Sequence, residues 1–161
     1  MAANSSPRPH RANSLGIGRV LVAVYGILAL AATGRSVFQI IDRFGEAPLA
    51  FSLSALSGVV YIVATIALVA PGATWYRVAR LTIGFELVGV VVVGTISVVA
   101  PGLLGLHSIN PFGREATVWS AYGLGYLLIP LALPVLGLLY LRRRRPATTA
   151  RGLAIPPDDA A

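Results

Sequence analysis

The chain has 161 residues, of which 56% are hydrophobic and only 12% are charged. An ordinary soluble domain is about one quarter charged, so a water-soluble protein of this size is excluded and one membrane-embedded domain is expected. The net charge of +7 comes from thirteen arginines, which flank hydrophobic segments and do not form the basic patch of a nucleic-acid-binding protein. The absence of cysteine excludes disulfides and thiolate metal sites.

The N-terminal part combines a polar tail with a first hydrophobic segment. Residues 1–14 are polar and lack hydrophobic periodicity, which is typical of a disordered tail. The run that follows, about 17–38, is long enough to cross a bilayer. A signal peptide is the alternative, because basic residues precede the run and Ala31-Ala32 resembles a cleavage site. The length of the run, and the three similar runs after it, favour a membrane span.

Three more segments, about 48–69, 78–100 and 118–141, each provide the roughly 20 residues that a helix needs to cross the hydrocarbon core. Ala-Pro-Gly at 70–72 and again at 100–102 marks two segment ends, since proline and glycine stop a helix. We therefore predict an all-α fold, a polytopic bundle of four transmembrane helices within residues 15–141. Because the connections are short, consecutive helices should be antiparallel neighbours.

The arginines predict the orientation of this bundle. Ten of them lie in the N-terminal tail and at the start of the first segment, in the second connection, or after the fourth segment, and three lie around the first and third connections. By the positive-inside rule, both termini are then cytoplasmic. Aromatic residues agree, because Trp75 and Tyr140 fall at the inner interface while Trp119 and Tyr122 fall near the outer one.

The strongest topology anchor is a run of four arginines directly after the fourth segment: Arg142, Arg143, Arg144 and Arg145. It opens a second disordered cytoplasmic tail, residues 142–161. These arginines are also within reach of anionic lipid head groups, although a stop-transfer anchor without a specific lipid is the interpretation we favour.

Glu86 is the only acidic residue inside a predicted span. An ionised carboxylate at that depth is costly, so Glu86 should be neutral, paired or in contact with water. Counting the same depth along the other spans predicts an intramembrane polar layer, made of Glu86, the hydroxyls of Tyr25 and Tyr61, and backbone carbonyls freed by Pro130 and Pro134.

Two interpretations of Glu86 remain open. In the one we favour, Glu86 is a hydrogen-bonded clasp between helices, or an ion pair with Arg19. In the other, Glu86 exchanges a proton or binds a cationic substrate, as intramembrane acids do in transporters. A single acid without a second titratable partner at its depth favours the clasp.

Stripes of small and weakly polar residues follow one face of the second span and one face of the third. Such stripes are where membrane helices pack closely. We predict that these two helices meet along them, with contacts from Ser54, Gly58, Thr65, Thr82, Gly89 and Ser97.

The third connection, 101–117, contains His107, Arg114 and Glu115. Catalytic zinc needs three protein ligands, and this loop offers at most two, so we predict no metal site and expect Arg114 and Glu115 to be solvated. No G-x-S-x-G, P-loop or H-E-x-x-H pattern occurs in the chain. The sequence therefore predicts no catalytic residues, no cofactor and no enzymatic activity.

Three stretches carry a resemblance to known proteins: GRVLVAVYGILALAATGRSV at 18–37, LSALSGVVYIVATIALVAPGATWYR at 53–77 and ATVWSAYGLGYLLIPLALPVLGLLYL at 116–141. They resemble an uncharacterised group of small four-span actinobacterial integral membrane proteins. This resemblance implies the four-span architecture and a bacterial plasma membrane. It implies no functional residues.

These patterns predict a multi-pass protein of the bacterial cytoplasmic membrane that acts as a non-enzymatic accessory or scaffold subunit. Its expected partners are the lipid bilayer and either a second copy of the chain or another membrane protein. The alternative is a small proton-coupled transporter that uses Glu86, similar to the small multidrug-resistance type in size and number of spans. Those transporters carry their essential acid in the first span, whereas Glu86 lies in the third.

Overall fold

The computed structural model describes residues 12–107, 110 and 112–144, and within this part of the chain the regular elements are all helical. Residues 1–11 of the predicted N-terminal tail, and the C-terminal tail from Arg145 onward, lie outside the described residues. Residues 12–14, which we predicted as part of the tail, belong instead to the first helix.

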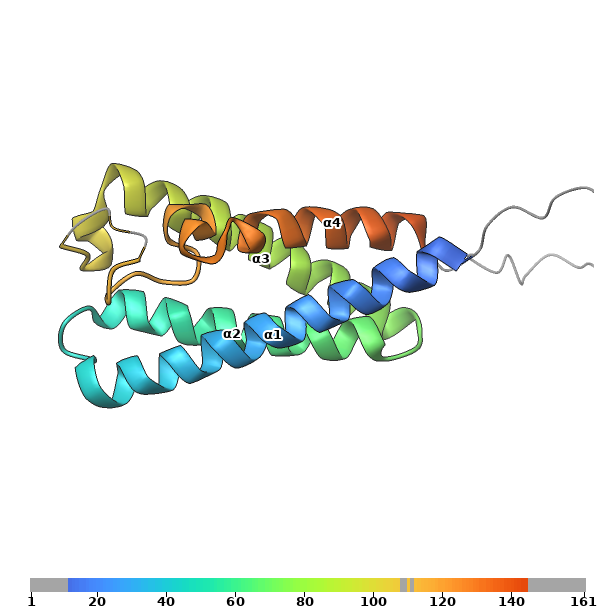
Figure 1. Ribbon diagram of the computed structural model, residues 1–161, viewed down its shortest axis with the longest axis horizontal. Coiled ribbons are helices and arrows are strands. Elements are labelled where there is room, and N and C mark those ends of the chain that lie inside the picture. The colour runs from blue at the N-terminus through green and yellow to red at the C-terminus, as the bar shows by residue number, and fades with distance from the viewer. Residues whose placement is uncertain (1–11, 108–109, 111, 145–161) are drawn as a thin grey trace, which may run out of the picture.

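Three long helices follow one another in antiparallel order (Figure 1): α1 at Ala12–Arg43, α2 at Pro48–Val69 and α3 at Ala73–Val99. Each of them is long and apolar enough to cross a membrane. The bounds of α2 agree with the predicted segment, whereas α1 is longer at both ends and α3 begins earlier than predicted.

The ends of these helices follow from local chemistry. Pro48 lies in the first turn of α2, where its missing N–H costs no hydrogen bond. Gly72, with φ 111°, turns the chain from α2 into α3 in a conformation that a residue with a Cβ rarely adopts. Pro101 follows the end of α3 and opens a short 3₁₀ helix, η1, at Pro101–Leu104.

The predicted fourth span, 118–141, is wrong as one straight helix. Its second half is α4, Ile129–Arg143, and its first half contains a 3₁₀ helix, η2, at Ser120–Tyr126. The two are bent by 98° relative to each other. The described part of the chain therefore has three continuous candidate spans, and a fourth only if this bent pair is counted as one broken span.

Local sequence explains why α4 begins at Ile129 and not at residue 118, where the predicted segment begins. Pro130 lacks the N–H that a helix interior requires and is tolerated in the first turn of α4. Gly123 and Gly125 weaken any helix that would precede it. Four residues around the bend adopt left-handed backbone conformations, with φ from 47° to 59°: Ala121, Tyr122, Leu127 and Leu128.

Each long helix packs against the next one in the chain. α1 packs against α2 along most of its length, α2 packs against α3, and α3 packs against both α4 and η2. Large side chains fill the core between them, whereas Leu30, Leu81 and Val99 on the outside are 70% or more exposed. Apolar side chains on the outer surface are what a bilayer would contact.

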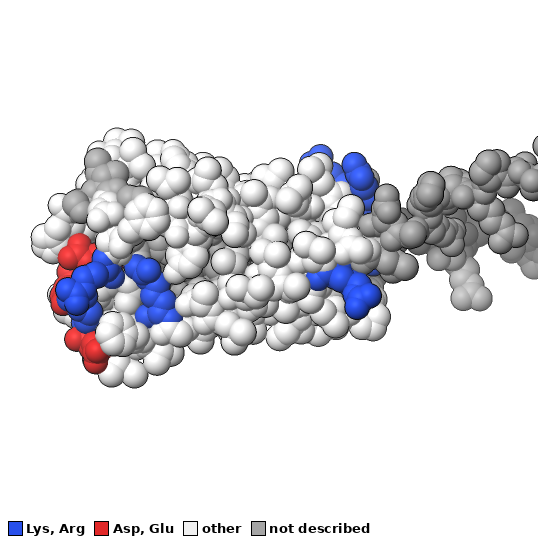
Figure 2. Space-filling model, in the orientation of Figure 1, with Lys and Arg blue, Asp and Glu red and all other residues white. Residues whose placement is uncertain are grey.

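Charge is distributed unevenly between the two ends of the molecule. We call one end the arginine end, where α1 begins, α2 connects to α3, and α4 ends; it carries Arg19, Arg77, Arg80, Arg142, Arg143 and Arg144. We call the other the mixed-charge end; it carries Arg35, Asp42, Arg43, Glu46, Arg114 and Glu115. Figure 2 shows a broad uncharged surface between the two ends, with acidic side chains visible only at the mixed-charge end.

Candidate functional site

Buried polar side chains from four parts of the chain meet in the core. We call Tyr25, Tyr61, Glu86 and Trp119 the tyrosine–carboxyl cluster, and each of them is at most 1% exposed. The hydroxyl of Tyr25 donates a hydrogen bond to Oε2 of Glu86 at 2.7 Å, and Nε1 of Trp119 donates one to the hydroxyl of Tyr61 at 3.1 Å. The rings of Tyr25 and Tyr61 lie 6.2 Å apart between centroids, which joins the two bonded pairs.

The partner of Glu86 differs in part from the prediction. Tyr25 contacts Glu86 as the depth count suggests, and Pro130 and Pro134 are buried in the same core. Among the described residues, however, Glu86 is bonded to the Tyr25 hydroxyl and to no carbonyl that the prolines free, and Oε1 of Glu86 has no hydrogen-bond partner. The carboxyl group is therefore closed off from solvent and held on one side only.

The alternative ion pair between Glu86 and Arg19 is wrong. Within the described part of the chain the ion pairs are Arg43–Glu46 and His107–Glu115. Arg19 is exposed at the arginine end, six residues before Tyr25, which places it roughly 9 Å along the helix from the level of Glu86.

Trp119 was missed by the sequence prediction. A tryptophan near the end of a hydrophobic segment is typical of an interfacial belt, yet Trp119 is 1% exposed and its ring lies directly on Gly89. A Cβ at position 89 would lie 2.8 Å from the nearest ring atom, so glycine is what makes room for the indole. The ring also meets Phe85 edge to face, with centroids 6.5 Å apart.

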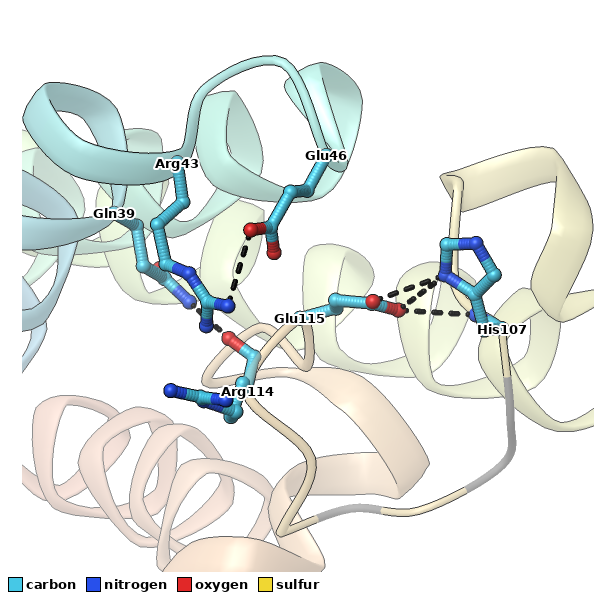
Figure 3. Close-up of polar contacts among 6 residues, drawn as sticks. All are labelled: Gln39, Arg43, Glu46, His107, Arg114 and Glu115. Atoms are coloured by element: carbon cyan, nitrogen blue, oxygen red, sulfur yellow. Dashed lines mark hydrogen bonds and ion pairs between the residues drawn. The ribbon is translucent and has the colours of Figure 1, made fainter.

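At the mixed-charge end, two side chains of α1 hold the connection that leads to η2. Nη2 of Arg35 donates to the carbonyl oxygens of Gly113 at 3.0 Å and Ala116 at 2.8 Å. Nε2 of Gln39 donates to the carbonyl oxygen of Arg114 at 2.9 Å (Figure 3). We call Arg35 and Gln39 the loop clamp, because they fix residues 113–116 to α1.

Glu115 lies in the same connection. We predicted that it is solvated, but its carboxylate is bonded to His107 (Figure 3). It accepts a hydrogen bond from the backbone N–H of His107 at 3.0 Å and lies 2.9 Å from Nδ1 of the His107 ring. The contact between the imidazole ring and the carboxylate raises the pKa of the exposed His107, and the same side-chain contact lowers the pKa of the Glu115 carboxyl. Arg43 and Glu46 form a separate ion pair nearby, at 3.0 Å.

No metal centre assembles around this pair in the described residues, where no three His, Asp or Glu side chains gather. His107 and Glu115 supply two donors and no third one joins them. The contact is therefore a bridge between the two ends of the connection, which closes the loop between η1 and η2.

A sequence signal for the loop clamp did exist. Arg35 and Gln39 are four residues apart, so both project from the same face of one helix. Polar side chains on one face of a hydrophobic helix indicate a polar partner. The spacing indicates that Arg35 and Gln39 share a partner, but it does not identify the carbonyl groups of residues 113–116 as that partner.

α2 and α3 pack against each other, and residues of the predicted packing stripes also contact other elements. Gly58 and Thr65 on α2 face α1, where a Cβ at Gly58 would touch Thr33 at 3.2 Å and Thr65 lies opposite Gly26. On α3, Gly89 faces Trp119. The hydroxyl of Ser97 accepts a hydrogen bond from the backbone N–H of Ala121 in η2, at 2.8 Å.

The remaining predicted residues on these stripes are buried or partly buried: Ser54 is fully buried, without a hydrogen-bond partner for its hydroxyl among the described residues, and Thr82 is half-buried. Of the four predicted anchor arginines, Arg142, Arg143 and Arg144 are exposed at the end of α4. Arg145 lies outside the described residues.

The described polar groups thus form three sites of different character: a dry cluster in the core, a clamp on an irregular loop, and a set of exposed arginines. Comparison of the chain with models of known protein families, with curated proteins and with solved structures found no match.

Proposed function

We propose that the chain is a non-enzymatic accessory or scaffold protein of a bacterial cytoplasmic membrane. The observation that carries this proposal is the environment of Glu86, which is 0% exposed and is held by the hydroxyl of Tyr25 at 2.7 Å. A proton- or cation-coupling carboxyl must exchange with water during its cycle. A carboxyl packed between α1 and α3 without exposure has the properties of a clasp that joins two helices.

The charge distribution supports an orientation with both termini in the cytoplasm. The arginine end carries six described arginines, whereas the mixed-charge end carries three arginines together with three acids. An excess of arginine close to the ends of spans favours the cytoplasmic side. The start of α1 and the end of α4 lie at the same end of the bundle (Figure 1). This is what a chain with an even number of membrane crossings requires.

A second candidate, a proton-coupled transporter, is favoured by one observation. Oε1 of Glu86 has no hydrogen-bond partner among the described residues, and an unsatisfied polar atom in the core is costly unless something binds to it. In this alternative, Glu86 would take up and release a proton from that side.

Purified protein reconstituted in vesicles that contain a trapped pH-sensitive dye separates the two candidates. Under an imposed pH gradient, the scaffold proposal expects the same proton flux for wild type, Glu86→Gln and empty vesicles. A flux that wild type shows and a well-folded Glu86→Gln variant lacks would overturn the clasp interpretation in favour of transport.

Comparing Glu86→Gln with Glu86→Ala tests the clasp directly. Gln keeps an acceptor for the Tyr25 hydroxyl, so Glu86→Gln should unfold close to wild type. Glu86→Ala removes the acceptor and leaves that hydroxyl buried and unpaired, which should cost about 1–3 kcal/mol. Equal stability of the Gln and Ala variants in equilibrium unfolding would show that the carboxyl does not join the helices.

The orientation can be measured because the chain has no cysteine of its own. We expect Gly45→Cys, at the mixed-charge end, to react with a membrane-impermeant maleimide added to intact cells. Ala73→Cys, at the arginine end, should react only after the membrane is permeabilised. The reverse labelling pattern would contradict the proposed topology, and wild type gives the background.

A further inference from the structure

A groove of about 410 Å³ opens at the arginine end, between the beginning of α1 and the ends of α2 and α4. Val22, Leu68 and Val69 give it an apolar wall, and Arg19 and Arg144 line it from two different helices. We call it the arginine-lined groove. It lies more than two turns of α1 away from Arg35, and the loop clamp does not contribute to it.

Local contacts hold the two arginines beside the groove. Tyr140 of α4 reaches across to Gly18 of α1, where an added Cβ would collide with the tyrosine hydroxyl. The guanidinium of Arg144 lies 4.9 Å from the centre of the Tyr140 ring, which is a cation–π contact. Arg19 directly follows Gly18, so the contact that joins α1 to α4 also brings both guanidinium groups to the same groove.

The described residues offer no carboxylate to neutralise these arginines. Asp42, Glu46 and Glu115 lie at the opposite end of the molecule, and Glu86 is buried in the core against Tyr25. Two exposed guanidinium groups that have no acidic neighbour in the described part of the chain attract an anion, and guanidinium groups match phosphate oxygens in both charge and geometry.

We infer that the arginine-lined groove binds an anionic phospholipid, with its phosphate between Arg19 and Arg144 and an acyl chain along Val22, Leu68 and Val69. The groove lies at the ends of the apolar helices, which is the depth at which head groups meet hydrocarbon. A free phosphate ion would use the arginines but not the apolar wall. The inference rests on the membrane location proposed above.

Native mass spectrometry of the full-length protein tests this assignment. The protein is extracted from vesicles containing equal amounts of phosphatidylglycerol and phosphatidylcholine with identical acyl chains. Wild type should retain phosphatidylglycerol selectively. The double variant Arg19→Gln/Arg144→Gln should retain about 10- to 30-fold less of it, which corresponds to the loss of two arginine contacts near a lipid surface.

A matched control removes the same charge from the same end of the molecule. Arg77 and Arg143 are exposed there and do not line the groove, so Arg77→Gln/Arg143→Gln should retain phosphatidylglycerol almost as wild type does. Filling the groove with Val22→Trp, which keeps every charge, should reduce retention as the arginine variant does. Added glycerol phosphate should not displace the lipid, because it lacks an acyl chain.

Equal retention of the two lipids by wild type would overturn the inference, as would equal losses in the groove variant and the control variant. Displacement by glycerol phosphate would assign the arginines to a soluble phosphate compound. Carbonate extraction of the same vesicles keeps this test separate from the membrane location: a protein that resists extraction but shows no lipid preference contradicts the groove alone, whereas a protein that is extracted contradicts the location.

Discussion

The two halves of the bundle satisfy their backbone polar groups in different ways. In the half at the arginine end, α1 to α4 are regular helices whose backbone hydrogen bonds lie mainly within each helix, and Tyr76 of α3 donates one to the carbonyl of Leu141 near the end of α4. In the half at the mixed-charge end, the place of the fourth helix is taken by η2 and the connection before it. There the backbone is bonded by side chains of other helices, namely Arg35 and Gln39 of α1 and Ser97 of α3.

This difference explains where polar residues occur along the helices. Non-helical backbone at membrane depth is tolerated only where protein groups satisfy it, because lipid cannot. Polar side chains facing the irregular half are therefore part of its structure. Substitutions that remove a contact to η2 or to its connection should cost more stability than substitutions of comparable side chains at the arginine end.

The largest effect is expected for Trp119, which directly precedes η2 and whose ring packs on Gly89 of α3 and donates a hydrogen bond to Tyr61 of α2. Trp119→Ala should destabilise the protein by about 3–5 kcal/mol, since it empties a core site and removes the hydrogen bond to Tyr61. Trp75, at the arginine end, is 39% exposed, and Trp75→Ala should stay within about 0.5 kcal/mol of wild type. Equilibrium unfolding in detergent micelles measures both, and similar losses would remove the distinction between the halves.

The loop clamp should give the next largest effect. Arg35→Ala leaves the carbonyls of Gly113 and Ala116 without their donor, which should cost about 2–3 kcal/mol. Arg114→Ala is the control, because that side chain is exposed and only its backbone carbonyl is used. Hydrogen exchange should accelerate at residues 113–120 in Arg35→Ala alone. Unchanged exchange there would mean that the loop is fixed by other contacts.

The bond between Tyr25 and Glu86 lies between regular helices and should matter less. Tyr25→Phe removes the hydroxyl but keeps the ring, and interhelical hydrogen bonds in membranes contribute about 0.6 kcal/mol on average. A double-mutant cycle of Tyr25→Phe with Glu86→Ala, which removes the acceptor, isolates this hydrogen bond. A coupling energy larger than the stability loss of Arg35→Ala would contradict the expectation that contacts in the irregular half contribute more to stability.

The smallest effect concerns pH. Because the pKa of His107 is raised, its contribution to folding stability is present in acid and is lost as the pH rises through the pKa of His107. Because the pKa of Glu115 is lowered, its contribution to folding stability is lost as the pH falls through the pKa of Glu115. The pair should thus be strongest in mildly acidic solution, between the ordinary carboxyl and imidazole values. NMR titration should show an elevated His107 pKa that Glu115→Gln returns to normal, whereas an unchanged value would dismiss the contact.

Much of the regular half could be predicted from local sequence. Segment length and the Ala-Pro-Gly stops mark α2 and the end of α3 because they act on neighbouring residues. Counting depth along helices brings Tyr25 level with Glu86 because the rise per residue is constant in each helix. The same count places Tyr61 in the core, where its ring lies 6.2 Å from that of Tyr25.

The irregular half could not be predicted in this way. Depth counting assumes a continuous helix, so it fails beyond the bend at η2 and misplaces Trp119. The contacts that stabilise the bend join residues far apart in the chain, such as Arg35 with Ala116 and Ser97 with Ala121. A hydrophobic pattern records that residues 118–128 avoid water, but it does not record which distant side chains complete their backbone bonds.

The short length of α4 makes the molecule sensitive to bilayer thickness on one side. With 15 residues, α4 is about 22 Å long, whereas the hydrocarbon core of a bilayer is about 30 Å thick. Lipids with longer chains can be matched by α1, α2 and α3 through a change in tilt. Beside α4, a thicker bilayer instead meets η2, so acyl-chain length acts first on the bend and on the loop that Arg35 holds.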